Sequence, residues 1–167
     1  MRLKLKYLIL ALASLAVAGC GFHLRGNVDV PESMRELELV MPAGRSTLRT
    51  ELTRTLRANG IELVAAAPQQ LEILEEKQGR RTASLDEEIK VDEYELRTEV
   101  HFQVIQGEKL LVPPSVARTE RVYSYDSGAI TAENEQADLL RREMQQDIAR
   151  QILRRYVAAA GKSSAGQ

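Results

Sequence analysis

The sequence predicts an α+β two-layer sandwich, in which two helices pack on one face of a mostly antiparallel sheet of four to five strands. Three patterns lead to this fold class. Apolar and polar residues alternate strictly over residues 93–104, as in a strand with one buried and one solvated face. Two separate segments have apolar residues every three or four positions, as in amphipathic helices. The order strand, helix, several strands, helix favours both helices on one side of a single sheet.

The first half of the domain is expected to contain a strand, a helix and a short second strand. Apolar and charged residues alternate over residues 34–41, which indicates a half-buried strand. Leucines spaced by four indicate a helix over residues 47–59, with Ser46 as its N-cap and Gly60 as its C-terminal signal. Residues 61–64 are expected to form a short strand that leads out of this helix.

The middle of the chain is expected to supply the antiparallel part of the sheet. Two strands are expected at residues 71–75 and 80–85, separated at residues 77–79. The long strand over residues 93–104 follows them. It ends at a hairpin turn around Gly107, where a glycine allows the tight reversal.

The return strand is expected over residues 109–125. Pro113 and Pro114 interrupt it. Because proline cannot donate a hydrogen bond to a ladder, we expect a bulge or an edge position there. A second amphipathic helix is expected from Thr131 to about Gly161, since apolar residues again recur every three or four positions.

The composition indicates one small domain. A length of 167 residues with 44% hydrophobic content is typical of a single core. One cysteine and two histidines cannot form a disulfide framework or a closed Cys/His zinc site. The 23 Lys and Arg residues are balanced by 24 Asp and Glu residues, so no overall field attracts nucleic acid. We therefore expect no metal, no cofactor and no nucleic-acid partner.

The N-terminus has the pattern of a secretory signal peptide. Basic residues precede an apolar run over residues 7–17, which is shorter than the roughly 20 residues that a membrane span needs. The sequence Val17-Ala18-Gly19-Cys20 resembles a bacterial lipobox. It predicts cleavage between Gly19 and Cys20 and the attachment of diacylglycerol and palmitate to Cys20, the one cysteine of the chain. The alternatives are an ordinary signal peptide with an incidental cysteine, and a buried membrane anchor.

This pattern divides the chain into four parts. Residues 1–19 are expected to be a lipoprotein signal peptide, and residues 20–31 a lipidated N-terminal tether. Residues 32–160 are expected to form the single α+β domain. Residues 161–167 have no apolar stretch to bury, so we expect a disordered tail.

No catalytic constellation stands out in the sequence. It contains no Gly-x-Ser-x-Gly, no His-Glu-x-x-His and no phosphate-binding glycine loop. His101 falls on the solvated face of its strand and His23 lies in the tether, so neither has an evident catalytic partner. The acidic residues 86–88 lack the glycine and the spacing of a calcium loop. An enzyme is therefore not expected.

The start of the mature chain, Cys20-Gly21-Phe22-His23-Leu24-Arg25-Gly26, resembles the start of the LptE family of lipopolysaccharide-assembly lipoproteins. The likeness continues at Val30-Pro31 and at residues 56–60, 93–94 and 133–136. The resemblance implies two helices on a mostly antiparallel sheet, in an outer-membrane lipoprotein of a Gram-negative cell that faces the periplasm. It also implies a plug inside LptD, the β-barrel protein that inserts lipopolysaccharide into the outer leaflet, with no cofactor and no turnover of its own.

Lipopolysaccharide carries phosphates and carboxylates, so the resemblance implies contact through arginine or lysine side chains. The alternative for each such residue is an ordinary solvated charge, and the acidic residues 86–88 lie where a positive charge would be expected. The candidates, which lie in or next to the expected strands, are Arg80, Arg81, Lys90, Arg118 and Arg121.

Two other functions fit a small lipid-anchored α+β domain. The first is an accessory lipoprotein, an adaptor or a pilot, of another outer-membrane barrel or secretion complex, which would hold its client by strand addition or in a helix groove. The second is a lipid-anchored hydrolase, which would need the catalytic residues that the sequence lacks. The partner that co-purifies with the protein distinguishes the accessory lipoprotein from an LptD plug.

Overall fold

The computed structural model describes residues 30–44, 46–85, 91–125, 128 and 130–164. The predicted signal peptide, the lipidation site and most of the predicted tether lie outside these residues. The elements, in chain order, are η1 (Glu32–Met34), β1 (Glu36–Val40), α2 (Thr47–Ala58), β2 (Glu62–Leu63), β3 (Gln69–Leu85), β4 (Val91–Gln106), β5 (Lys109–Ser124) and α3 (Ile130–Ser164).

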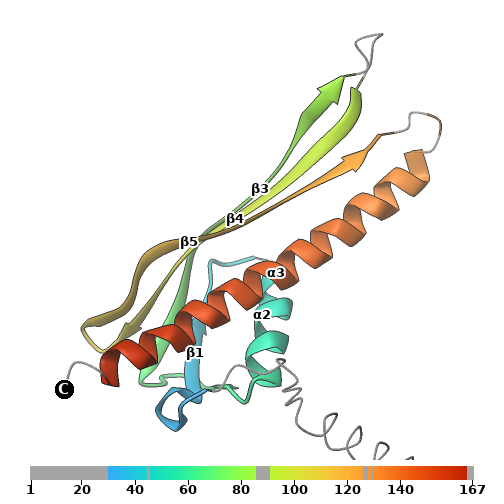
Figure 1. Cartoon of the computed structure of the whole chain (residues 1–167). Coiled ribbons are helices and arrows are strands. Elements are labelled where there is room, and N and C mark those ends of the chain that lie inside the picture. The colour runs from blue at the N-terminus through green and yellow to red at the C-terminus, as the bar shows by residue number, and fades with distance from the viewer. Residues whose placement is uncertain (1–29, 45, 86–90, 126–127, 129, 165–167) are drawn as a thin grey trace, which may run out of the picture.

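Five strands form one sheet in the order β2-β1-β3-β4-β5. The long pairs β3 with β4 and β4 with β5 are antiparallel, whereas the short strand β1 is parallel to both of its neighbours. Figure 1 shows α2 and α3 on the same side of this sheet. The predicted α+β sandwich is therefore confirmed, with five strands whose longest ladders are antiparallel.

Helix α2 follows its prediction to within one residue. Ser46 is the N-cap, because its Oγ accepts a hydrogen bond from the N–H of Leu48 at 3.1 Å. All three leucines of the four-residue repeat are buried in the core. The helix ends at Ala58, and Gly60 follows with φ of 77°, a left-handed conformation that favours glycine after a helix.

Replacing Ser46 with alanine should lower the free energy of unfolding by about 1 kcal/mol. Alanine removes the cap on the Leu48 N–H and also the hydrogen bond that the Ser46 hydroxyl donates to Glu76 of β3 at 2.7 Å. Threonine at the same position keeps a hydroxyl and is the control. Urea denaturation compares the two variants, and an alanine variant as stable as the wild type would contradict the capping role.

Strand β3 corrects one prediction. The sequence predicts a break at residues 77–79, but the structure has one strand of 17 residues. Gly79 is paired in register opposite Arg97 of β4, and the register shifts lie elsewhere, next to Leu74 and Ala83. The long alternating strand β4 offers a continuous ladder. Pairing with it outweighs the cost of one glycine in a strand, about 0.5–1 kcal/mol.

Strand β5 is an edge strand and continues through Pro113-Pro114, with the expected irregularity opposite them. The register shifts lie between residues 102 and 105 of β4. They move the ladder so that Tyr123 lies opposite Tyr94, where an unshifted hairpin would place Arg121. One shift skips Leu111 and the other spans the two prolines, and together they decide which side chains meet at the far end of the sheet.

Helix α3 has 35 residues. It begins one residue before Thr131 and extends three residues past Gly161, where the sequence predicts its end. Among the described residues, no helix is both long enough and apolar enough to span a membrane. The buried side chains of α3 that join the core include Ala137, Met144, Ile148, Ile152 and Tyr156.

The core has two parts. The larger cluster lies where both helices cover the sheet, and it includes Leu52, Phe102 and Ile152. The smaller cluster contains Leu96, Tyr123, Ala137 and Met144, and it belongs to the sheet and α3 without α2. We call the end of the sheet at which β3 and β5 finish and β4 begins the distal end, and Figure 1 shows it extending beyond α2.

Candidate functional site

The residues predicted to bind lipopolysaccharide do not form one site. Arg80 of β3 and Arg121 of β5 are both paired opposite Leu96 of β4, and they share its helix-covered face. Arg81 and Arg118 lie on the other face, which we call the open face because no described helix covers it. This separation follows from the pleat, since neighbouring residues in a strand point to opposite faces.

Three predicted site residues lie outside the described part of the chain. They are Gly19 and Cys20 at the predicted cleavage site and Lys90 before β4. Their roles stay predictions.

Arg80 belongs to a group of side chains that we call the distal cluster, formed with Tyr94, Tyr123, Tyr125 and Glu133. The guanidinium carbon of Arg80 lies 4.3 Å from the centroid of the Tyr94 ring, a cation–π contact. The Tyr94 ring centroid is 5.9 Å from that of Tyr123 and 5.1 Å from that of Tyr125. These are ordinary distances for aromatic pairs.

Glu133 joins the distal cluster to α3. Its Oε1 accepts a hydrogen bond from the Tyr123 hydroxyl at 3.2 Å and lies 3.5 Å from Nη1 of Arg80. The hydrogen bond to Tyr123 raises the pKa of Arg80, and the Glu133 charge adds to this effect. Only 7% of the Glu133 side chain is exposed, so an anionic ligand at Arg80 would compete with a buried carboxylate.

Arg121 joins β5 to α3. Its Nη2 pairs with Asp147 of the helix, and its Nη1 donates to Oγ1 of Thr119 at 3.1 Å. Asp147 also pairs with Arg150. A ligand that takes Arg121 would have to replace Asp147, so the structure gives Arg121 a role in packing, and its contact with lipopolysaccharide stays a prediction.

The open face carries a network of opposite charges, which we call the open-face network. Arg81 binds Glu95 through two parallel hydrogen bonds of 2.8 and 2.9 Å. Nε of Arg118 lies 2.5 Å from Glu99, which Arg97 also contacts. The members of the network are Lys77, Arg81, Arg97 and Arg118 with Glu75, Glu95, Glu99 and Glu120.

Two carboxylates of the open-face network, Glu95 and Glu99, are held in their charged form. The hydrogen bonds from Arg81 hold the pKa of Glu95 below its usual range. Hydrogen bonding from Arg97, together with the charge of Arg118, lowers the pKa of Glu99. Exposed ion pairs contribute little to stability, so the network acts mainly as a polar surface whose charges cancel.

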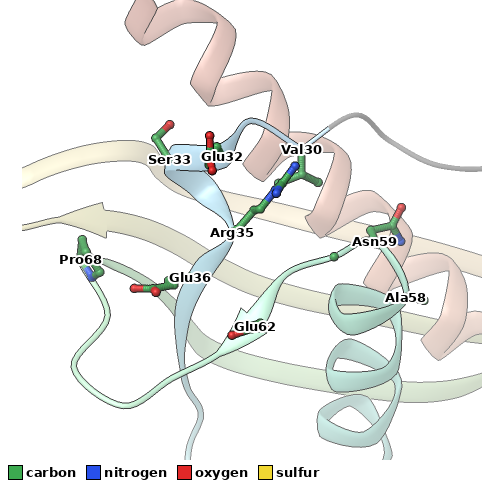
Figure 2. A pocket seen from close by; sticks show the side chains of 10 residues that line it. Val30, Glu32, Ser33, Arg35, Glu36, Ala58, Asn59, Glu62 and Pro68 are labelled. Carbon is green, nitrogen blue, oxygen red and sulfur yellow. The ribbon is translucent and has the colours of Figure 1, made fainter.

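A cavity of about 880 Å³ lies at the end of the sheet away from the distal cluster. Figure 2 shows Arg35, Glu36 and Glu62 around it, together with Val30, the first described residue. Its charged lining is three glutamates and one arginine. Because carboxylates repel phosphate, this cavity suits a lipopolysaccharide headgroup poorly.

Metal-binding side chains do not gather in the described residues: no group of three or more His, Cys, Asp or Glu there could hold a metal ion. His101 lies on the open face, half-buried between Glu75 and Val116 of the neighbouring strands. The candidate sites are therefore surfaces, namely the distal cluster and the open-face network.

Comparison with known proteins assigns the chain to a family. The family model LptE, described as lipopolysaccharide-assembly, matches residues 33–156. The chain belongs to the LptE family. The matched region runs from η1 into α3 and includes all five strands of the sheet, so the LptE assignment rests on most of the described residues.

Curated relatives and solved structures agree with the LptE assignment. The LPS-assembly lipoprotein LptE of Pectobacterium atrosepticum is 31% identical over 165 residues, which cover 96% of this chain and 89% of the relative. A minor lipoprotein from Acinetobacter baumannii has a TM-score of 0.63 at 31% identity, covering 75% of this chain and 92% of its own. The rare lipoprotein B from Shewanella oneidensis has a TM-score of 0.68 at 27% identity, covering 79% of this chain and 99% of its own.

Sequence reasoning missed the aromatic part of the distal cluster in this LptE-family chain. The alternation over residues 93–104 places Tyr94 on the buried face, but it does not predict the contact of Tyr94 with Tyr123 or the hydrogen bond from Tyr123 to Glu133. Tyr123 meets Tyr94 only because of two register shifts, one at Leu111 and one at Pro113-Pro114. The two prolines were the available signal, but they predict an irregularity without its size.

Proposed function

We propose that this chain is an outer-membrane lipoprotein that works in lipopolysaccharide assembly as a plug within the β-barrel LptD, without catalysing a reaction. The observation that carries this proposal is membership of the LptE family, shown by a match over residues 33–156. The name of the Pectobacterium relative supports the role in lipopolysaccharide assembly. The partner, the location and the binding of lipopolysaccharide are inferred.

The surface of the domain supports a place inside a barrel. The interior of a large outer-membrane barrel is polar, and a barrel with many strands leaves a channel that its own side chains cannot fill. The open-face network presents alternating arginine and glutamate side chains whose charges cancel. Such a surface suits a polar wall better than it suits lipid.

The anchor supports a location at the periplasmic side of the outer membrane. Acyl chains on Cys20 would fix the chain to the inner leaflet of that membrane. The 12 residues of the predicted tether, 20–31, reach at most about 40 Å when extended. That reach lets the folded domain enter the barrel lumen while the acyl chains stay in the surrounding lipid.

The open face is the best location for a lipopolysaccharide contact. Arg81 and Arg118 have side chains that are 69% and 53% exposed, so both keep access to solvent beside their glutamate partners. Arginine can bind a phosphate through two hydrogen bonds. We therefore assign these two arginines to lipopolysaccharide ahead of Arg80 and Arg121, which are engaged with α3.

Changing both Arg81 and Arg118 to aspartate should weaken the binding of purified lipopolysaccharide by about tenfold or more, since two charge-assisted contacts are lost. Arg142→Asp, on an exposed position of α3, is the control for added negative charge. Binding is measured by titrating lipopolysaccharide into the mature lipoprotein. Equal affinities of the double variant and the control would move the ligand site away from the open face.

Affinity purification of the lipidated chain from its own cells in a mild detergent tests the proposed partner. We expect LptD to be recovered as the principal partner, identified by mass spectrometry. Recovery of a different barrel or secretion complex without LptD would favour the accessory-lipoprotein alternative and contradict the plug.

A further inference from the structure

The distal half of β3, residues 74–85, is the least covered part of the sheet. Strand β1 pairs with β3 at Gln70, Leu71 and Glu72, and within the described residues no strand lies beside β3 beyond them on the side away from β4. Every residue from 74 to 85 is exposed except the half-buried Glu76 and Ser84. Figure 1 shows this half of β3 on the far side of β4 from α3.

The opposite edge of the sheet is covered by side chains of α3 at residues 116–118. The side-chain amide of Gln151 donates to the carbonyl of Arg118 at 3.0 Å and accepts from the N–H of the same residue at 3.4 Å. Arg155 donates to the carbonyl of Val116 at 2.7 Å. These side chains occupy backbone groups of β5 that an added strand would need. Natural proteins commonly protect edge strands in such ways, whereas the distal edge of β3 has no comparable cover in the described structure.

A cavity of about 270 Å³ lies beside this uncovered edge. Its lining includes three arginines. Arg80 is engaged with the buried Glu133, and Arg97 is engaged with Glu99 and Glu120. Arg141 uses Nη1 for an ion pair with Asp138 at 2.8 Å, and its side chain is 43% exposed, so other N–H donors remain available. The lining residues are Gln78, Gly79, Arg80, Leu96, Arg97, Thr98 and Arg141.

Gly79 marks the middle of the uncovered edge. Its backbone does not have a positive φ, and a Cβ atom there would meet no atom within 4 Å, so nothing within the chain requires glycine at this position. A glycine in a strand interior often marks a place where another backbone approaches closely. Exposed leucines, Leu74 at 46% and Leu85 at 54%, lie towards the two ends of the same segment.

We propose that residues 74–85 of β3 accept an extended segment of a partner protein as a sixth strand, and that an aspartate or glutamate of this segment enters the cavity beside Gly79. Backbone hydrogen bonds would supply the affinity, and alternate side chains of the added strand would supply the specificity. The segment is acidic at its centre, opposite Arg141, and apolar near its ends, opposite Leu74 and Leu85. The inference rests on the proposed function, because the barrel protein is the partner that supplies the segment.

Hydrogen–deuterium exchange of the lipidated chain, alone and in its co-purified complex with the barrel, tests the added strand. We expect peptides that cover residues 74–85 to exchange about tenfold more slowly in the complex, because free amides become hydrogen-bonded. Peptides that cover residues 116–118 should be unchanged. Unchanged exchange at residues 74–85 in a preparation that contains the barrel would overturn the inference and leave the plug intact, whereas absence of the barrel would count against the plug.

Charge reversal tests the acidic residue of the segment. Arg141→Glu should reduce the amount of barrel recovered per molecule of chain by about tenfold, while Arg142→Glu, at the next and exposed position, should not. Equal recovery with the two variants would overturn the acidic match. Purified lipopolysaccharide added to the chain alone is the third arm. If it slows exchange at residues 74–85 as much as the barrel does, the edge binds glycolipid and the strand proposal is wrong.

Discussion

Replacing Cys20 with serine should leave the protein as an unprocessed precursor without acyl chains. The lipobox reading requires a thiol, because the diacylglycerol is attached to sulfur before the signal peptide is removed, and serine cannot substitute for it. We expect lipidation to be lost completely, since Cys20 is the one cysteine of the chain. Incorporation of labelled palmitate and the size of the chain on a denaturing gel measure both consequences.

His23→Ala, three residues further along the tether, is the matched control and should mature normally. The two alternatives for the N-terminus give different results. A Cys20→Ser chain that is still cleaved would indicate an ordinary signal peptide. A wild-type chain that keeps residues 1–19 would indicate a membrane anchor.

Replacing Tyr156 with alanine should lower the free energy of unfolding by about 3–5 kcal/mol, which is the range for removing a buried aromatic side chain. Tyr156 is fully buried in the main core. Its hydroxyl lies 2.9 Å from the carbonyl of Met34 and 2.7 Å from Oε1 of Gln69. One side chain of α3 thus fixes the end of η1 and the start of β3.

Tyr156→Phe separates packing from hydrogen bonding. It keeps the ring and should cost about 1–3 kcal/mol, because the single hydroxyl proton that these two buried acceptors share is lost. Urea denaturation followed by far-ultraviolet circular dichroism measures both variants, since the chain has no tryptophan. A Tyr156→Ala variant whose free energy of unfolding is within about 1 kcal/mol of the wild type would contradict the role of Tyr156 in the core.

Tyr156 should also make the free energy of unfolding depend on pH in the alkaline range. Burial raises the pKa of Tyr156, so the folded domain holds the neutral phenol. The contribution of Tyr156 to stability is therefore complete below the unfolded pKa, about 10, and is lost as the pH rises above it. Tyr156→Phe should remove this part of the pH dependence.

Local patterns predicted most of the elements of the fold. The leucine repeat of α2, the alternation of β4 and the apolar spacing of α3 each report which face of an element is buried, and burial decides these elements. The sequence did not reveal that β3 is one strand, because Gly79 and its polar neighbours break the local pattern. Pairing with β4 maintains that strand, and pairing is a property of two segments rather than one.

Local patterns predict the candidate site only in part, because they place a side chain on a face but do not show which other segment supplies its partner. Arg80 and Arg81 are adjacent, so the alternation of a strand already places them on opposite faces. Their partners were not predictable, because Glu133 approaches from α3 and Glu95 from β4. The pairing of Arg121 with Asp147 also depends on how the helix lies across the sheet, which no local pattern reports.

Electron cryo-microscopy of the lipidated chain in complex with the barrel that co-purifies with it tests the central claim most directly. We expect the five-stranded domain to lie in the barrel lumen. A domain bound outside the barrel, with an empty lumen, would contradict it.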